Sequence, residues 1–198
     1  MDKVLPLFHS DLFIKENVGT EELREDLKRQ ILQAKKDDRG TQGGSNPGCW
    51  RSNALYEMKW LYDEMKNLVI EANQNYFERD SVFEYYVDKS NNLDYNIWTN
   101  VNEVGSKNVI HSHKTDAWAG IYYVQAEGTG NLMFYNPANI LHDCNQKTPF
   151  VRDFAIEPKD GDLLIWPAWV PHYVEENKSN KQRINIATNI NLVGVDNA

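Results

Sequence analysis

Three of the five histidines of this chain are spaced in a way that could bind a metal ion. His111 and His113 stand one residue apart in VIHSHKTDAWAGIYYV, a segment rich in strand-forming residues, and His172 follows about sixty residues later in WPAWVPHYVEE. In a strand, side chains at i and i+2 point to the same face, so we expect the pair to lie side by side. Strands on opposite sides of a small barrel would bring His172 to them. His9 and His142 have polar, turn-like neighbours and are expected not to be ligands.

Ferrous iron is the metal that such a cluster suits. Imidazoles and carboxylates bind Fe(II) in oxygenases and leave coordination positions open for substrate and O₂. The third ligand stays open, because His113 is favoured by the strand geometry and Asp116, three residues further on, is favoured by its carboxylate. An HxH pair also occurs on the solvated face of a strand, so the metal-site hypothesis depends on His172 as well.

The composition predicts one globular domain spanning residues 1–198. Hydrophobic residues make up 41% of the chain, yet no apolar run approaches the ~20 residues of a membrane span, and the N-terminus lacks the apolar core of a secretory signal. We therefore predict a cytoplasmic protein. The net charge of −8 and the lack of a basic stripe disfavour nucleic acid as a partner. Cys49 and Cys144, without CxxC spacing, are expected to be unpaired thiols.

The N-terminal part predicts one strand and two helices. An edge strand is expected within 4–14, and a helix over 19–37 with Thr20 as its N-cap, acidic residues in its first turn and leucines at helical spacing. The segment 38–53 is rich in Gly, Ser and Asn and is predicted to be a loop. A second amphipathic helix is expected over about 54–78.

From about residue 82 onward the pattern changes to short runs of β-branched and aromatic residues. Gly, Asn, Pro and Asp separate the runs, which are FEYYVD, YNIWTNV, AGIYYVQ, NLMFYNP, FAIEP, DLLIWPAW and QRINIATNINL. Many short strands with turn signals between them favour a sandwich or barrel. The predicted fold class is therefore mainly β, with a jelly-roll core over about 82–193 and the two helices of the N-terminal part, about 1–80, packed on its outside.

Four segments of the β region resemble the core of an enzyme family. HSHKTDAWAGIYYV, GNLMFYNP, IEPKDGDLLIWPAWVPH and QRINIATNI follow the order and spacing of the putative 2OG-Fe(II) oxygenase family, which is distantly similar to prolyl hydroxylases. The resemblance covers roughly residues 95–192, and SNPGCWRSN resembles the family's N-terminal part. It implies a double-stranded β-helix (jelly-roll) core, Fe(II) as the metal and 2-oxoglutarate as co-substrate.

The resemblance also implies which residues hold the iron. His111 matches the first iron-binding histidine of the family, and His172 matches the distal one. Most of the superfamily has Asp or Glu two residues after the first histidine, where this chain has His113. The implied site therefore has either three histidines or Asp116 as its carboxylate ligand.

A second set of residues resembles the co-substrate site of the family. Arg183 resembles the arginine that binds the distal carboxylate of 2-oxoglutarate, and Tyr123 resembles the tyrosine that hydrogen-bonds the same group. Asn185 shares the face of Arg183, Asn100 is a weaker candidate, and Tyr122 is expected in the core. Independently of the resemblance, a dianion inside a barrel must be neutralised, and the planar fork of an arginine suits a carboxylate.

The implied activity is that of a dioxygenase which hydroxylates an unknown prime substrate and releases succinate and CO₂. Its partners would be 2-oxoglutarate, O₂ and that substrate; an oligomer is compatible with the sequence. Trp118 and Trp169 lie near the proposed metal ligands in sequence, so one of them is a candidate for lining a substrate pocket. The segments 38–53 and 136–150 are candidate lids.

Two alternatives keep the fold and change the function. In the first, a cupin-type metal dioxygenase or isomerase binds its substrate directly, without 2-oxoglutarate. In the second, the jelly roll is a non-catalytic binding module, and the histidines matter only for stability. Arg183 discriminates between the first alternative and the oxygenase hypothesis, since only a 2-oxoglutarate site needs this side chain to point into the barrel.

Overall fold

The computed structural model describes residues 10–41, 45–52, 59–77, 93–113, 116–136 and 153–192, and within them it has two helices and ten strands. The helices are α1 (Glu21–Asp37) and α2 (Lys59–Phe77). The six-stranded major sheet has the order β1 (Phe13–Lys15), β8 (Leu163–Pro167), β5 (Trp118–Gln125), β10 (Arg183–Leu192), β3 (Leu93–Asn102) and β2 (Trp50–Arg51). The four-stranded minor sheet has the order β4 (Asn108–His111), β9 (His172–Val174), β6 (Leu132–Phe134) and β7 (Phe154–Ile156).

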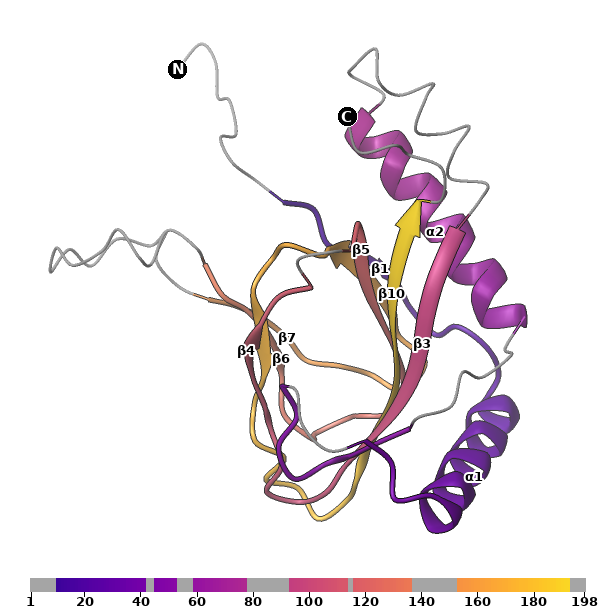
Figure 1. Cartoon of the computed structure of the whole chain (residues 1–198), viewed down its shortest axis with the longest axis vertical. Helices are drawn as coiled ribbons and strands as arrows, with labels where there is room; N and C mark the ends of the chain where they lie inside the picture. Colours follow the sequence, from indigo (N-terminus) through magenta and orange to yellow (C-terminus); the bar gives the residue numbers. More distant parts are fainter. Residues whose placement is uncertain are drawn as a thin grey trace, which may run out of the picture.

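The two sheets face each other, and both helices lie on the outside of the major sheet (Figure 1). All neighbouring strands are antiparallel. From β3 to β10 the chain passes repeatedly between the sheets, because β3, β5, β8 and β10 belong to the major sheet and the strands between them belong to the minor one. This alternation confirms the predicted mainly-β jelly roll with two helices outside it. That the chain forms a single domain stays a prediction.

Helix α1 forms where the sequence predicts it. Its N-cap is Thr20, whose side-chain oxygen accepts a hydrogen bond of 3.2 Å from the Leu23 N–H. Glutamates in the first turn and lysines in the last complement the helix dipole. Leu27 and Ile31 are buried in the apolar cluster that α1 and α2 share with the outer face of the major sheet, and Ala34 packs against it. The amphipathic stripe thus decides which face of the helix the sheet covers.

The other N-terminal predictions are met in part. Helix α2 starts at Lys59 in the structure, and residues 53–58 lie outside the described residues, as do 1–9 at the start of the predicted edge strand. Of that prediction the structure has β1 at Phe13–Lys15. The predicted strand FEYYVD falls within 78–92 and also lies outside the described part of the chain. Neither described helix combines the length and the apolar character that crossing a membrane requires.

Strand β5 shows how the sequence builds two cores on one sheet. Trp118, Tyr122 and Val124 join the cluster under the helices, whereas Ile121 and Tyr123 join a second cluster between the sheets. Because successive side chains of a strand alternate between faces, a strand covered on both sides is apolar throughout. Tyr122 is therefore a core residue, as predicted.

Strand β10 breaks this rule on one face only. Its isoleucines at 184, 186 and 190 face the helices, but Arg183 and Asn185, with Asn189, line the space between the sheets. A strand that turns polar side chains into a buried space marks that space as a site rather than as a core.

Strand β2 was not predicted, whereas β4 and β9 are the strands that were expected to carry His111 and His172. Strand β2, within the segment 38–53 predicted to be a loop, pairs Trp50 with Val101 and Arg51 with Asn100 at the edge of the major sheet. Strands β4 and β9 pair with each other in the minor sheet, so the expectation that His111 and His172 come from opposite sides of the barrel was wrong. Two to four residues are too few for an alternating pattern to show in the sequence, and the pairing with distant strands supplies the hydrogen bonds.

Candidate active site

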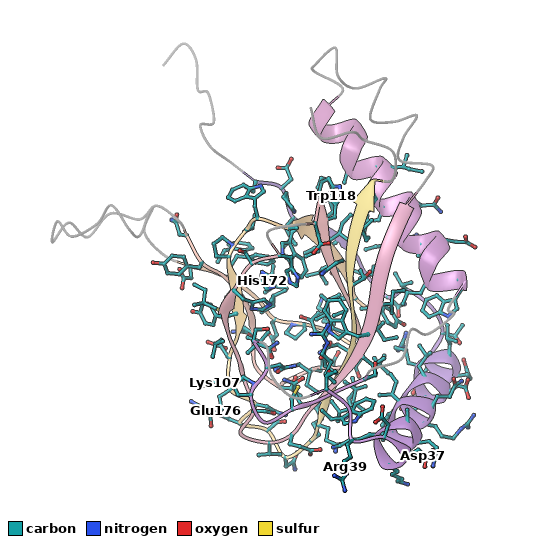
Figure 2. The ribbon with its side chains drawn as sticks, viewed as in Figure 1. Asp37, Arg39, Lys107, Trp118, His172 and Glu176 are labelled. Carbon is teal, nitrogen blue, oxygen red and sulfur yellow. The ribbon has the colours of Figure 1, made fainter. Side chains whose placement is uncertain are left out.

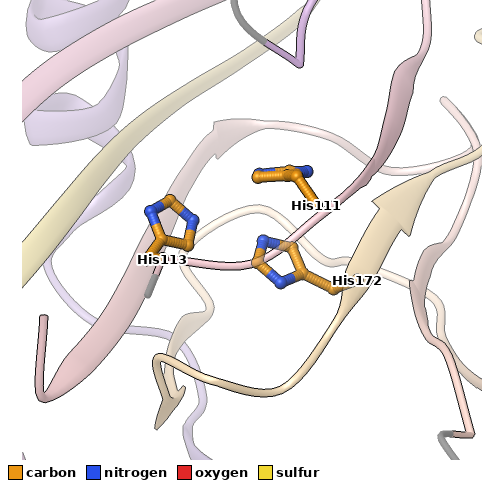
Figure 3. Close-up of side chains that lie close together, drawn as sticks. All are labelled: His111, His113 and His172. Carbon is orange, nitrogen blue, oxygen red and sulfur yellow. The ribbon is translucent and has the colours of Figure 1, made fainter. Parts of the chain in front are cut away.

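The three predicted histidines come together between the sheets. His111 ends β4 and His172 begins β9, and the two residues are directly opposite each other in the register of that strand pair. The ring centroids are 4.3 Å apart for His111 and His172, and 5.2 Å apart for His113 and either of the others. One nitrogen from each ring lies within 4.8 Å of the others. Figure 3 shows the three imidazoles gathered around one point.

His113 reaches this cluster by a route other than the predicted one. Strand β4 ends at His111, so His113 lies beyond the strand and is not its i+2 neighbour within it. Its backbone N–H instead donates a hydrogen bond of 2.9 Å to the Ala168 carbonyl, which holds the chain against the segment after β8. The expectation of two rings side by side on one strand was wrong, although the rings do lie together.

The orientation of two rings suits metal binding. Nδ1 of His111 lies 2.9 Å from the Val109 carbonyl oxygen, and Nδ1 of His172 lies 3.0 Å from the Val170 carbonyl oxygen. A carbonyl can only accept, so in each neutral ring Nδ1 carries the proton and Nε2 keeps its lone pair. Such carbonyl partners are typical of metal-binding histidines, whose tautomer they fix.

Burial keeps these rings neutral. It lowers the pKa of His172, which is 4% exposed, to about 3, with a smaller contribution from His111. It lowers the pKa of His113 to about 4 and also lowers that of His111. All three imidazoles are therefore unprotonated at neutral pH, which is the form that binds a metal ion.

Asp116, the alternative third ligand, lies outside this cluster. Among the described residues, the group of potential metal ligands consists of His111, His113 and His172. The backbone N–H of Asp116 donates to the His113 carbonyl at 3.2 Å, so the carboxylate belongs to the turn that follows the histidine. The geometry brings His113, and not Asp116, to the other two rings.

A cavity of about 250 Å³ opens beside the histidines and extends to Arg183. Figure 2 shows His172 among the side chains between the sheets, whereas the labelled Asp37, Lys107 and Glu176 lie at the periphery. Tyr123, Asn185 and Asn100 also line the cavity. The structure thus places the four residues predicted for 2-oxoglutarate in one cavity with the histidines.

Arg183 and Tyr123 carry polar atoms for which no described residue is a partner. Each side chain is 1% exposed. Arg183 Nη1 donates to the Thr129 carbonyl at 2.9 Å, but its Nη2 and the Tyr123 hydroxyl have no hydrogen-bond partner in the described part of the chain. No carboxylate among the described ion pairs neutralises Arg183. Burial lowers the pKa of Arg183 and raises that of Tyr123. Buried groups of this kind are costly unless a ligand completes them.

Asn100 and Asn185 are bonded to each other. The Asn100 amide donates to Asn185 Oδ1 at 2.9 Å, and Asn46 donates to Asn100 Oδ1 at 3.3 Å. Asn100 lies in β3 and Asn185 in β10, so this bond links two neighbouring strands across the cavity wall. These amides thus satisfy each other within the cavity wall, whereas Arg183 and Tyr123, and also Trp166 Nε1 and Asn189 Oδ1, have polar atoms without a partner among the described residues.

The tryptophans of the site are not the predicted ones. Trp118 packs against Phe13 in the cluster under the helices, and Trp169 is 56% exposed. Neither is among the described residues of the cavity wall, which instead include Trp98 and Trp166. Nearness in sequence to a ligand misled the prediction, because Trp118 faces the opposite side of β5 and Trp169 is in a surface turn.

Arg51 is the functional candidate that the sequence analysis missed. It lines the cavity, and its guanidinium carbon lies 4.2 Å from the ring centroid of Trp98. Arg51 fell within a segment predicted to be a loop, so no periodicity pointed to it. Trp98 could have been found, because it precedes Asn100 by two residues in the same strand and therefore shares its face. Of the predicted lid segment 136–150, residues 137–150, with His142 and Cys144, lie outside the described residues, as does His9.

A protein-family model matches the region of the sequence that carries this site. Residues 96–189, which carry β4 to β9 with most of β3 and β10, match the model described as "Putative 2OG-Fe(II) oxygenase". The match bears out the resemblance of this part of the chain to the 2OG-Fe(II) oxygenase family. The match confirms the class of enzyme, an oxidoreductase, and the cofactor pair that the resemblance implied, Fe(II) and 2-oxoglutarate. No curated protein matches the sequence.

Solved structures share the fold of this oxygenase. A prolyl-4-hydroxylase from Pseudomonas putida is 14% identical with a TM-score of 0.62, over 92% of this chain and 93% of that one. A Trichoplax adhaerens prolyl hydroxylase, solved with a hypoxia inducible factor peptide, is 13% identical with a TM-score of 0.63, over 91% and 83%. HygX from Streptomyces hygroscopicus, solved with nickel and 2-oxoglutarate, is 10% identical with a TM-score of 0.61, over 93% and 84%. At these identities the likeness establishes the fold.

Two adjacent tyrosines of the oxygenase give a matched test of its unpaired groups. The Tyr122 hydroxyl donates to the Val18 carbonyl at 2.8 Å, whereas the Tyr123 hydroxyl has no partner among the described residues. We expect Tyr122→Phe to lower the free energy of unfolding of the ligand-free protein by about 1 kcal/mol. Tyr123→Phe should leave it unchanged or raise it. Urea unfolding of both variants measures the difference, and equal losses would contradict the assignment of an unsatisfied Tyr123.

Proposed function

We propose that this oxygenase hydroxylates a substrate at an iron centre held by His111, His113 and His172, with 2-oxoglutarate bound by Arg183 and Tyr123. The observation that carries the proposal is a buried arginine whose Nη2, like the Tyr123 hydroxyl, has no partner among the described residues, in the same cavity as three neutral imidazoles. A dicarboxylate that chelates a metal through one end needs a cation for the other, and a carboxylate would complete both orphaned groups. Asn100 and Asn185 are proposed to support this pocket.

The residues of the cavity have separate tasks. When bound, the iron and 2-oxoglutarate supply the oxidising chemistry, in which 2-oxoglutarate becomes succinate and CO₂ as O₂ is consumed. Three histidine ligands leave positions open for the co-substrate and O₂. Arg183 neutralises and orients the distal carboxylate, Tyr123 donates a hydrogen bond to it, and the apolar wall formed by residues such as Leu132 and Ile121 excludes water.

The cupin-type alternative gains no support from the cavity. Under this alternative Arg183 has no ligand to bind. Its buried side chain nevertheless lines the cavity, whereas a structural arginine would be expected at the barrel mouth beside an acidic residue. The histidine cluster itself suits both hypotheses, so the co-substrate is the point on which they differ.

Anaerobic titration tests the proposal directly. Fe(II) and 2-oxoglutarate added together are expected to give a weak visible charge-transfer band, because the 2-oxo and carboxylate groups chelate the iron. Fe(II) alone, or Fe(II) with glutarate, which lacks the 2-oxo group, should give none. Iron binding without the band would favour the cupin-type alternative, and no iron binding would contradict both enzyme hypotheses. Cytoplasmic location, the exclusion of nucleic acid and the oligomeric state stay predictions.

A further inference from the structure

Arg51 is a second cation in the cavity that the proposed function does not use. It lies in β2, at the edge of the major sheet, and lines the cavity on the same side as Trp98 and His113. Its guanidinium stacks on Trp98, whose ring centroid is 6.4 Å from that of His113. Trp98 therefore contacts Arg51 and also lies near His113, so Arg51 is on the part of the cavity wall close to the metal ligands.

The contacts of Arg51 leave its hydrogen-bond donors available. Stacking on an aromatic ring uses the flat face of a guanidinium, whereas its five N–H groups point outward in the plane. No ion pair of Arg51 occurs among the described residues. Its burial lowers its pKa, which reflects the cost of holding a charge there without a counterion. The side chain is thus a half-buried cation whose donors have no partner among the described residues.

The cavity as a whole also has an excess of positive charge. The chain contains 29 acidic residues, yet none is among the described residues that line this cavity. Three neutral histidines leave the charge of a divalent metal uncompensated. A 2-oxoglutarate dianion offsets part of the charge of the metal and Arg183, and Arg51 remains in excess. An anion is the group that this excess would attract.

We propose that Arg51 binds an anionic group of the prime substrate, a carboxylate or a phosphate, and that the oxygenase acts on a small negatively charged molecule. This inference rests on the proposed function, because it counts 2-oxoglutarate among the occupants of the cavity. The planar fork of Arg51 suits either oxyanion. A cavity of about 250 Å³ that contains both Arg51 and the histidines favours a small molecule, whose anionic group binds Arg51 while another part of it reaches the metal.

Nuclear magnetic resonance of the arginine side chains tests this with simple anions. The protein is labelled with ¹⁵N, loaded with Zn(II) as a diamagnetic ion and saturated with 2-oxoglutarate. Sodium sulfate represents a phosphate and sodium acetate represents a carboxylate, each compared with sodium chloride at equal ionic strength. The signals observed are the Nε–H groups of Arg51, Arg183 and Arg29, with the Trp98 indole N–H. Arg29, exposed on α1 beside Asp26, is the internal control.

The expected result is a saturable shift of Arg51 and Trp98 with sulfate, acetate or both, while Arg29 follows only ionic strength. The anion that binds more tightly then identifies the anionic group of the substrate as a phosphate or a carboxylate. In Arg51→Gln the response of Trp98 should be lost, although 2-oxoglutarate still shifts Arg183. No shift of Arg51 beyond that with chloride would overturn the inference. So would a shift of Arg51 by 2-oxoglutarate itself that leaves no further response to either anion.

The 2-oxoglutarate site and the anion site at Arg51 are tested separately by these signals. If 2-oxoglutarate does not shift Arg183, the proposed function fails whatever Arg51 does. If Arg183 responds normally and Arg51 does not, only the substrate inference is wrong.

Discussion

Replacing Arg183 with methionine is expected to weaken 2-oxoglutarate binding about 30-fold or more, since losing one partner of a buried charge pair costs about 2 kcal/mol or more. The same substitution should leave the ligand-free protein as stable as the wild type, or more stable. It removes a buried guanidinium whose Nη2 has no described partner, and methionine fills a similar volume. The loss of the hydrogen bond to the Thr129 carbonyl is the opposing contribution.

Two measurements separate these effects. Calorimetric titration of the Fe(II)-loaded protein under anaerobic conditions gives the affinity for 2-oxoglutarate, and urea unfolding gives the stability. Arg183→Lys is the matched control, since it keeps the charge but lacks the planar fork, and it should bind with intermediate affinity. Unchanged 2-oxoglutarate binding in Arg183→Met would contradict the assignment of the distal carboxylate. A large loss of stability would instead show that the arginine is a structural residue.

The second large effect is expected at the metal. His172→Ala and His113→Ala should each lower Fe(II) affinity by on the order of 100-fold or more, because a lost ligand should cost more than the 10–100-fold loss usual for a residue that only supports one. Asp116→Ala should leave the affinity close to that of the wild type, since its carboxylate is outside the histidine cluster. Competition with a chelator under anaerobic conditions measures all three variants.

Comparing His113→Ala with Asp116→Ala also decides which of the two residues is the third iron ligand. Weakened binding in Asp116→Ala with normal binding in His113→Ala would overturn the three-histidine site and favour a histidine–carboxylate site reached by rearrangement of the turn. Far-UV circular dichroism and urea unfolding of each variant serve as controls, because His172 is buried and its removal leaves a space between the sheets.

The sequence was most informative where the signal is local. Thr20 and the leucines after it predict α1 and its buried face, and the alternation of isoleucines with Arg183 and Asn185 predicts which side of β10 faces the cavity. Such patterns depend on the geometry of a single helix or strand, so a few residues suffice to reveal them. The order of the short strands is characteristic of a jelly roll. That order allowed the fold class to be predicted, and with it the meeting of the three histidines.

Where the structure depends on pairing over long distances, the sequence was not enough. His113 reaches its position through a hydrogen bond to Ala168, and no spacing of residues reveals that contact. Arg51 enters the cavity because a two-residue strand pairs with β3, and Trp118 leaves it because of the side of β5 on which it lies. Each of these depends on the register between distant segments, which a single sequence does not encode in a visible pattern.

The division of the site between two sheets has a consequence for its dynamics. The histidines lie on or beside β4 and β9, strands of four and three residues, whereas Arg183 and Tyr123 lie on β10 and β5, which are long and central in the sheet backed by the helices. Local opening requires less free energy where few backbone bonds and apolar contacts must break. The metal-binding half should therefore open and exchange its amide protons faster, while the co-substrate half keeps its arrangement through many such openings.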